Sequence, residues 1–173
     1  MKNHLIEAVF LVLFFIWILV FGVGCSGKGE SGVLIGPEGG IITSSDGTIS
    51  IFVPEGALDK DTFISTAVLS EDLLPIPPPE GNFLVVGVEL KPNGLEFNTP
   101  VTITVLLDTE FQPGTPFPLL VFNPIDNIFE LEGEAVVSED GTSISWQTTH
   151  FSIWGVLFSI ICQRSYGAVK VKK

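Results

Sequence analysis

The sequence predicts an all-β protein, an antiparallel β-sandwich of about ten short strands behind an N-terminal export segment. Glycine (18), proline (12) and phenylalanine (14) are frequent while methionine occurs once, so residues typical of turns and strands outnumber helix formers. Short apolar runs alternate with turn clusters, and no segment shows a helical period. With 46% hydrophobic and 16% charged residues, the 173 residues fit one domain with an appendage.

The N-terminal segment has the pattern of an export signal. Lys2 precedes an apolar run over residues 8–24, which is only just long enough to cross a membrane as a helix. The sequence Gly-Val-Gly-Cys that ends at Cys25 resembles the lipobox of bacterial lipoproteins, in which the cysteine thiol is lipid-modified. This resemblance implies a signal peptide over residues 1–24 and Cys25 as the lipidated N-terminus. An uncleaved signal anchor and a secretory signal that leaves a free Cys25 are the alternatives.

The expected location is therefore the cell envelope, at a bacterial outer membrane or cell surface, with the lipid on Cys25 as the membrane anchor. Residues 25–32 form a short flexible tether. The chain has only one other cysteine, Cys162, and lipidation of the first leaves no disulfide within the chain. Cys162 is expected to be a buried thiol or the link of a disulfide dimer.

The domain is expected over residues 33–158 and begins with a hairpin. Strands over residues 41–44 and 48–53 flank Asp46-Gly47, a pair that supplies the positive φ angles of tight hairpin turns. The second strand alternates apolar and other residues, and Pro54 ends it because proline has no amide donor for a ladder. Asp140-Gly141-Thr142 repeats the same turn. Further strands are expected over residues 62–70, 83–90, 101–107, 118–123, 128–131, 135–138, 142–147 and 151–158.

The charge is unevenly distributed. Residues 33–161 hold eighteen acidic residues against Lys60 and Lys91, whereas the C-terminal tail, residues 159–173, is basic. An acidic body without a basic patch is a poor partner for nucleic acid and is typical of a soluble surface outside the cell. The apolar run over residues 151–162 is too short to cross a bilayer as a helix, so it is expected to hold the last strand and an extension of it.

Three sequence blocks occur in an order that resembles the ZU5 domain family: SDGTISIFVPEGAL (45–58), KPNGLEFNTPVTITV (91–105) and TTHFSIWGV (148–156). The resemblance spans about residues 33–157 and implies a β-sandwich that acts as a protein-interaction or structural module. Its partner would be another envelope protein, bound through a sheet edge or loops. In the central block, Pro92 and Gly94 are expected to form a turn, Phe97 to return to the core and Pro100 to open the next strand.

The same resemblance suggests a self-cleavage site at His150-Phe151-Ser152. Some members of the family cleave themselves at a His-Phe-Ser triplet, so Ser152 would attack the carbonyl of Phe151 with His150 as the base. On a regular strand, residues two apart share a face but their Cα atoms lie about 6.5 Å apart, so the two polar side chains need a local kink to meet. The alternative is a structural strand in which Phe151 and Ile153 fill the core while His150 and Ser152 face outward or bond to a neighbouring loop.

Other enzymatic functions have little support. His150 is the only histidine outside the signal, and no phosphate loop, dinucleotide fingerprint or histidine cluster is present, so no cofactor and no metal site are expected. Calcium or a small ligand bound at acidic turns near Asp108-Thr109-Glu110 or Glu139-Asp140 is a further alternative, since these turns carry hard oxygen ligands.

Overall fold

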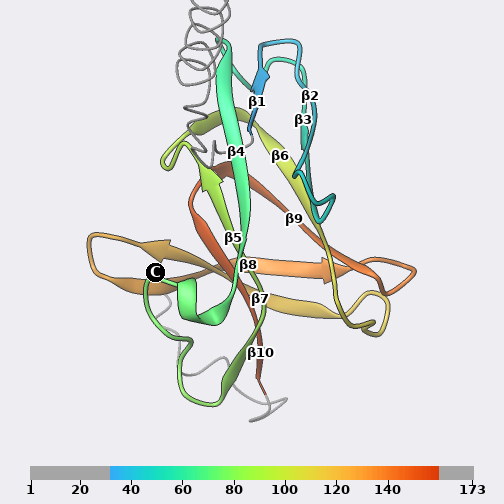
Figure 1. Ribbon diagram of the computed structural model, residues 1–173, viewed down its shortest axis with the longest axis vertical. Helices are drawn as coiled ribbons and strands as arrows, with labels where there is room; N and C mark the ends of the chain where they lie inside the picture. The colour runs from blue at the N-terminus through green and yellow to red at the C-terminus, as the bar shows by residue number, and fades with distance from the viewer. Residues whose placement is uncertain (1–31, 160–173) are drawn as a thin grey trace, which may run out of the picture. The chain divides into compact units, whose positions relative to one another are not determined.

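The computed structural model describes residues 32–159, which form ten β-strands and one short 3₁₀ segment, η1 (Glu71–Leu73). The all-β prediction is confirmed (Figure 1). The predicted signal peptide, Cys25, Cys162 and most of the basic tail lie outside the described residues. The strands are β1 (Gly32–Ile35), β2 (Gly40–Thr43), β3 (Ile49–Val53), β4 (Thr62–Leu69), β5 (Asn82–Lys91), β6 (Glu96–Leu106), β7 (Pro116–Asn123), β8 (Ile128–Val137), β9 (Ser143–His150) and β10 (Ile153–Ser159).

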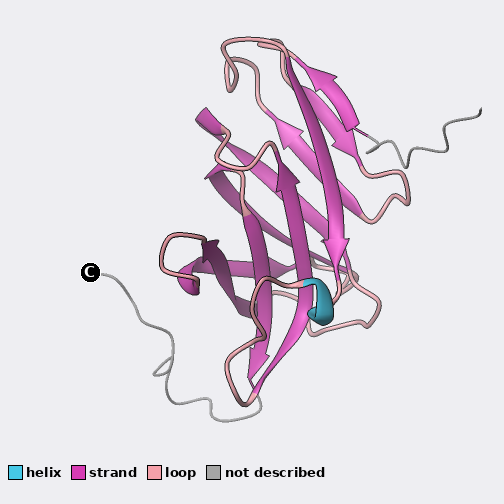
Figure 2. Cartoon of the chain, turned by 60° about the vertical axis from the view of Figure 1, so that its left-hand side comes forward, coloured by secondary structure: helices cyan, strands magenta, loops and turns pink. Residues whose placement is uncertain are grey.

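The strands form one sheet in the order β1-β4-β5-β10-β7-β8-β9-β6-β3-β2, and every neighbouring pair is antiparallel. The contact between β8 and β9 is short, because only Val136 and Val137 pair across it. The sheet is a nearly closed, barrel-like structure (Figure 2). Its two end strands are β1 and β2. The group from β1 to β8 and the group from β9 to β2 thus act as the two layers of a sandwich.

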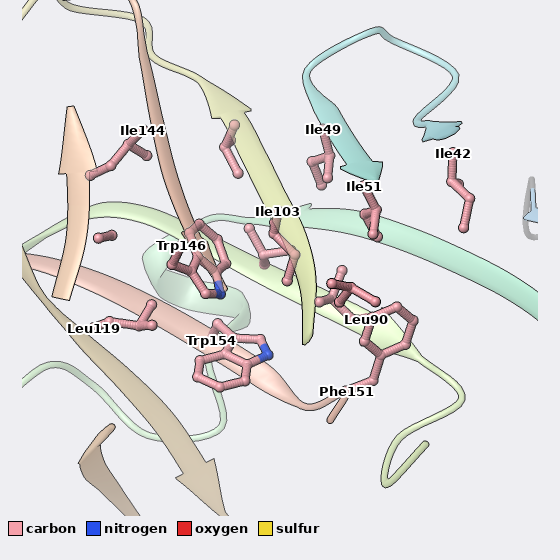
Figure 3. Packing of buried hydrophobic residues seen from close by; sticks show 14 of the residues in the cluster. Ile42, Ile49, Ile51, Leu90, Ile103, Leu119, Ile144, Trp146, Phe151 and Trp154 are labelled. Carbon is pink, nitrogen blue, oxygen red and sulfur yellow. The ribbon is translucent and has the colours of Figure 1, made fainter. Parts of the chain in front are cut away.

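The core lies between these two groups of strands. In β3, Ile49, Ile51 and Val53 are buried while Phe52 is exposed, as the alternation in the sequence predicts. Trp146 from β9 and Trp154 from β10 meet in the middle of the core, with ring centroids 6.3 Å apart (Figure 3). Burying one large apolar side chain stabilises the fold by about 1.5–3 kcal/mol, so this core is the main source of stability.

Two differences from the sequence-based expectation concern which strands exist. β1 was not predicted, because its sequence Gly-Val-Leu-Ile is only four residues long and becomes a strand by pairing with β4. The two predicted strands over residues 128–131 and 135–138 are in fact the single strand β8, since pairing with β7 carries the chain through Gly133. The pairing has a bulge between Leu119 and Leu120 of β7, where the register shifts. The bulge lets β8 continue through the residues that the sequence analysis had placed between two strands.

The prediction that Pro100 opens a strand was wrong, because this proline lies inside β6. It falls between Glu96 and Val101, where the pairing of β6 with β9 shifts its register. The missing amide of Pro100 therefore breaks no bond of that ladder. Pro54 does end a strand as predicted, since β3 stops at Val53.

The two Asp-Gly turns have the same structure, as predicted, but only their glycines adopt positive φ, 75° at Gly47 and 78° at Gly141. Among the non-glycine residues described, only Asn127 has a positive φ, so Asp46 and Asp140 act through their side chains instead. Each carboxylate accepts one hydrogen bond from the serine two residues before it and one from the backbone amide two residues after it. The distances are 2.5 and 2.9 Å for Asp46, and 2.6 and 3.0 Å for Asp140.

These hydrogen bonds favour the ionised form of both acids. The hydroxyl of Ser138, followed by the amide of Thr142, lowers the pKa of Asp140 from 3.8 to about 2. The hydroxyl of Ser44 and the amide of Thr48 likewise lower the pKa of Asp46. A carboxyl group whose pKa is lower in the folded protein stabilises the fold above its unfolded pKa. That contribution is lost as the pH falls from about 4 through the folded pKa.

We therefore expect an Asp46→Asn/Asp140→Asn variant to be less stable than the parent at about pH 5, and this difference to shrink at about pH 2.5. Urea unfolding of both proteins at the two pH values measures it. Asp72→Asn serves as the control, because Asp72 is exposed in η1 and belongs to neither turn. A stability difference that is equal at both pH values would show that the two carboxylates do not act as described.

Candidate functional site

The His-Phe-Ser triplet lies where the chain passes from β9 to β10. His150 is the last residue of β9, Phe151 and Ser152 form the link, and β10 starts at Ile153. The predicted strand over residues 151–158 therefore began two residues too early. Since β9 pairs with β6 whereas β10 lies between β5 and β7, the two link residues carry the chain from one group of strands to the other.

Both the side chain and the backbone of Phe151 make close contacts with the central sequence block. Its side chain is fully buried in the core (Figure 3). It meets Phe97 edge to face, with ring centroids 4.8 Å apart, and Phe97 is itself buried, so the predicted return of Phe97 to the core is confirmed. Its amide donates to the carbonyl of Leu95 at 2.8 Å, and its carbonyl accepts from the amide of Gly94 at 2.9 Å. Gly94 has a φ of 77°, which glycine adopts without the strain that a side chain would bring. The central block thus holds the triplet in place.

Ser152 is buried, and its hydroxyl donates to the carbonyl of Phe122 on β7 at 3.3 Å. Its own carbonyl accepts from the amide of Leu90 on β5 at 3.1 Å. The alternative expected Ser152 to face outward or to bond to a loop, whereas its hydroxyl is buried and bonds to a strand of the sandwich. Ile153, which the same alternative placed in the core, is only half-buried. A buried hydroxyl needs such a partner, because an unpaired one costs about 1–3 kcal/mol.

His150 lies on the other side of the link. Its imidazole packs on the indole of Trp154, with ring centroids 5.2 Å apart and an interplanar angle of 41°. The hydroxyl of Thr148 accepts from the amide of His150 at 3.2 Å and donates to its carbonyl at 3.0 Å. Within residues 32–159, no hydrogen bond joins the imidazole of His150 to the hydroxyl of Ser152. The structure thus brings the three residues together without engaging the base with the nucleophile.

A second feature lies where the two ends of the sheet approach each other. A groove of about 90 Å³ runs between β2, with the turn after it, and the pair β1 and β4. Sequence reasoning missed this groove because β1 was not predicted. The residues that line it are Gly32, Val33, Ile42, Thr43, Ser44, Ser45, Ile64 and Thr66.

Large apolar side chains are exposed on the strands beside this groove. Leu34 of β1 is 62% exposed and pairs with Phe63 of β4, which is 53% exposed. Ile41 of β2 is 67% exposed and pairs with Phe52 of β3, which is 51% exposed. Exposed apolar pairs on end strands are a common mark of a binding surface.

The described residues contain no group of three or more His, Cys, Asp or Glu side chains that could hold a metal ion. The carboxylate of Asp140, one of the acids considered for calcium, is already bound to Ser138 and Thr142. Over residues 32–159 no helix is long and apolar enough to cross a membrane.

The first part of this domain matches a known protein family. Residues 31–113 match the family model of the ZU5 domain. The ZU5 resemblance is confirmed. The first two of the three sequence blocks lie within the match, whereas the triplet block over residues 148–156 lies beyond its last residue. ZU5 domains are a family of protein-interaction modules. No curated protein matches the chain.

Proposed function

We propose that this chain is an exported, membrane-anchored ZU5 module that binds another protein of the cell envelope. The ZU5 match supports the interaction role. The main structural support for this role is the open edge of the end strands β1 and β2, which lie beside the groove. The lipobox-like sequence before Cys25 supports the anchoring, with residues 1–24 as the signal peptide and the lipid on Cys25 as the anchor.

The end strands offer a physical mode of binding. β1 pairs only with β4 and β2 pairs only with β3 among the described strands, so each leaves one row of backbone groups without a strand partner. An extended segment of a partner can add to such an edge, with affinity from backbone hydrogen bonds and specificity from alternate side chains. Ile41 and Phe52 lie next to the edge of β2 and offer apolar contacts to alternate side chains of that segment.

We expect a photo-crosslinking residue at exposed Thr43 of β2 to form adducts with a partner in intact cells, and an Ile41→Asp/Phe52→Asp variant to lose them. Both side chains are more than half exposed, so the thermal midpoint should change little. Leu106→Asp on β6 is the matched control, because Leu106 is 54% exposed and lies away from the edge of β2. Adducts that persist in the double variant would place the binding surface elsewhere.

The anchoring is tested by a Cys25→Ser variant of the full chain. Without the thiol no lipid can be attached, so we expect the protein to move from the membrane fraction to the soluble fraction. Fractionation of cells followed by detection of the protein measures this. Retention of the variant in membranes would instead support an uncleaved signal anchor.

Self-cleavage between Phe151 and Ser152 is the second candidate function, and one observation favours it. The amide of Gly94 donates to the carbonyl oxygen of Phe151 at 2.9 Å, so a donor already lies beside the oxygen that would become the oxyanion. In the reaction, the hydroxyl of Ser152 bonds to the carbonyl carbon of Phe151 while its proton passes to His150. The bond to the amide nitrogen then breaks, the nitrogen takes the proton, and water hydrolyses the resulting ester.

The reaction needs two rearrangements. The hydroxyl of Ser152 must leave the carbonyl of Phe122, and the imidazole of His150 must turn from Trp154 toward it. Under this function, the purified full chain measured under denaturing conditions shows two fragments divided between Phe151 and Ser152, and the Ser152→Ala variant shows one intact mass. One intact mass for both proteins would leave the triplet with a structural role only.

A further inference from the structure

The segment between η1 and β5 is a run of prolines on the surface of the domain. It reads Leu-Pro-Ile-Pro-Pro-Pro over residues 74–79. It lies at the end of the domain away from β1, because β1 pairs with the first half of β4 whereas η1 comes after the last residue of that strand (Figure 1). The segment is therefore separate from the edge of β2 on which the proposed function rests.

The sequence of this segment favours the polyproline II conformation. Leu74 has a φ of −66° and a ψ of 146°, close to the angles of about −75° and about 145° of that helix. Every later residue up to position 79 is a proline, with φ fixed at about −65°, or precedes a proline and is kept out of the helical region. The peptide bonds before the four prolines are trans. The dihedral angles of Leu74 and the restrictions imposed by the prolines thus agree.

Two aliphatic side chains hold the segment on the domain. Leu74 and Ile76 are half-buried and pack on a small apolar cluster that is separate from the main core. Leu74 also lies against Gly87 of β5, where a Cβ would be 3.3 Å from its Cδ2 atom. The cluster consists of Leu120, Phe129 and Leu157. Because these contacts already order the segment, binding it costs a partner little conformational entropy.

The other side of the segment is open to solvent. Pro75 and Pro77 are exposed, and Leu73 just before them is 62% exposed. Within residues 32–159 the carbonyl groups of residues 74–78 accept no hydrogen bond from a backbone amide. Grooves lined by aromatic side chains bind prolines held in this conformation, and their Trp and Tyr side chains can donate to free carbonyl groups.

Acidic side chains flank the segment at both ends. Glu71 and Asp72 of η1 precede it and Glu80 follows it, and all three are exposed. No lysine or arginine occurs between Lys60 and Lys91. The charge around the prolines is therefore negative, and it is complementary to a basic surface on a partner.

We infer that residues 71–80 are a docking segment for a protein whose groove combines aromatic side chains with basic side chains at its ends. The aromatic rings pack on Pro75 and Pro77, and the basic side chains meet the acids that flank the prolines. This contact reads the shape of a polyproline II segment, whereas the surface at β2 offers backbone pairing to a strand. The inference thus goes beyond the proposed function and adds a second contact surface.

Photo-crosslinking in intact cells that produce the full chain tests the role of the prolines. A photo-crosslinking residue at Leu73 should form adducts with a partner, and Pro75→Ala/Pro77→Ala should lower their yield several-fold, because the variant loses two rings and frees the backbone. Both prolines are exposed, so the thermal midpoint should change little. Pro113→Ala/Pro124→Ala is the matched control, since these two prolines are exposed in other turns.

Charge reversal tests the chemistry of the groove. Glu71→Lys/Asp72→Lys/Glu80→Lys should also lower the adduct yield several-fold, because lysines then face basic side chains of the partner. Mass spectrometry of the cross-linked peptides should place the adducts beside aromatic and basic residues of the partner. An unchanged yield after charge reversal, or adducts far from any aromatic residue, would overturn the inferred groove.

Three further results would overturn the inference. The first is the absence of adducts at Leu73 in the parent, and the second is a yield that persists in the proline variant. The third is an adduct of twice the mass of the chain, which would assign the surface to a second copy. The Ile41→Asp/Phe52→Asp variant should keep the adducts at Leu73, so loss of the partner at β2 and loss of the partner at the prolines are distinguished.

Discussion

The link between β9 and β10 is the constraint on which the rest of the structure depends. At Phe151 and Ser152 a single stretch of chain moves from the group of strands that contains β6 to the group that contains β5 and β7. Three backbone hydrogen bonds fix the link: the amides of Leu90 and Gly94 donate to it, and the carbonyl of Leu95 accepts from it. The buried ring of Phe151 packs on Phe97. Each hydrogen bond contributes about 1 kcal/mol and the ring several times that, so the link is rigid and positions both layers.

The same contacts define the chemistry available at the triplet. The amide of Gly94 polarises the carbonyl of Phe151, which is the group that a self-cleaving serine would attack. Yet the hydroxyl of Ser152 is directed to the carbonyl of Phe122, and the imidazole of His150 packs on Trp154. In this arrangement the side chains of His150 and Ser152 have separate partners, and the backbone of the triplet is held in place. The difference between the two roles lies in side-chain rotation, because the backbone is already in place.

The nearly closed sheet decides where the domain can bind. Closing the sheet completely would leave no edge, but the short contact between β8 and β9 and the separation of β1 from β2 leave open strand edges among residues 32–159. These edges differ in chemistry. The edge of β2 lies beside exposed isoleucine and phenylalanine, whereas the edge of β8 carries exposed glutamates. One small domain therefore offers an apolar surface and an acidic surface for separate contacts.

The sequence alone determined the all-β class, the two Asp-Gly turns, the end of β3 at Pro54 and the ZU5 resemblance, because each depends on local residue chemistry and spacing. It also pointed to Phe97 as a core residue and to the triplet as a place of interest. Only the tertiary structure decided that Gly-Val-Leu-Ile forms β1, that residues 128–137 are one strand, and that Ser152 turns toward β7. These outcomes depend on pairing between segments far apart in the chain. No local pattern contains the partner whose hydrogen bonds and packing select them.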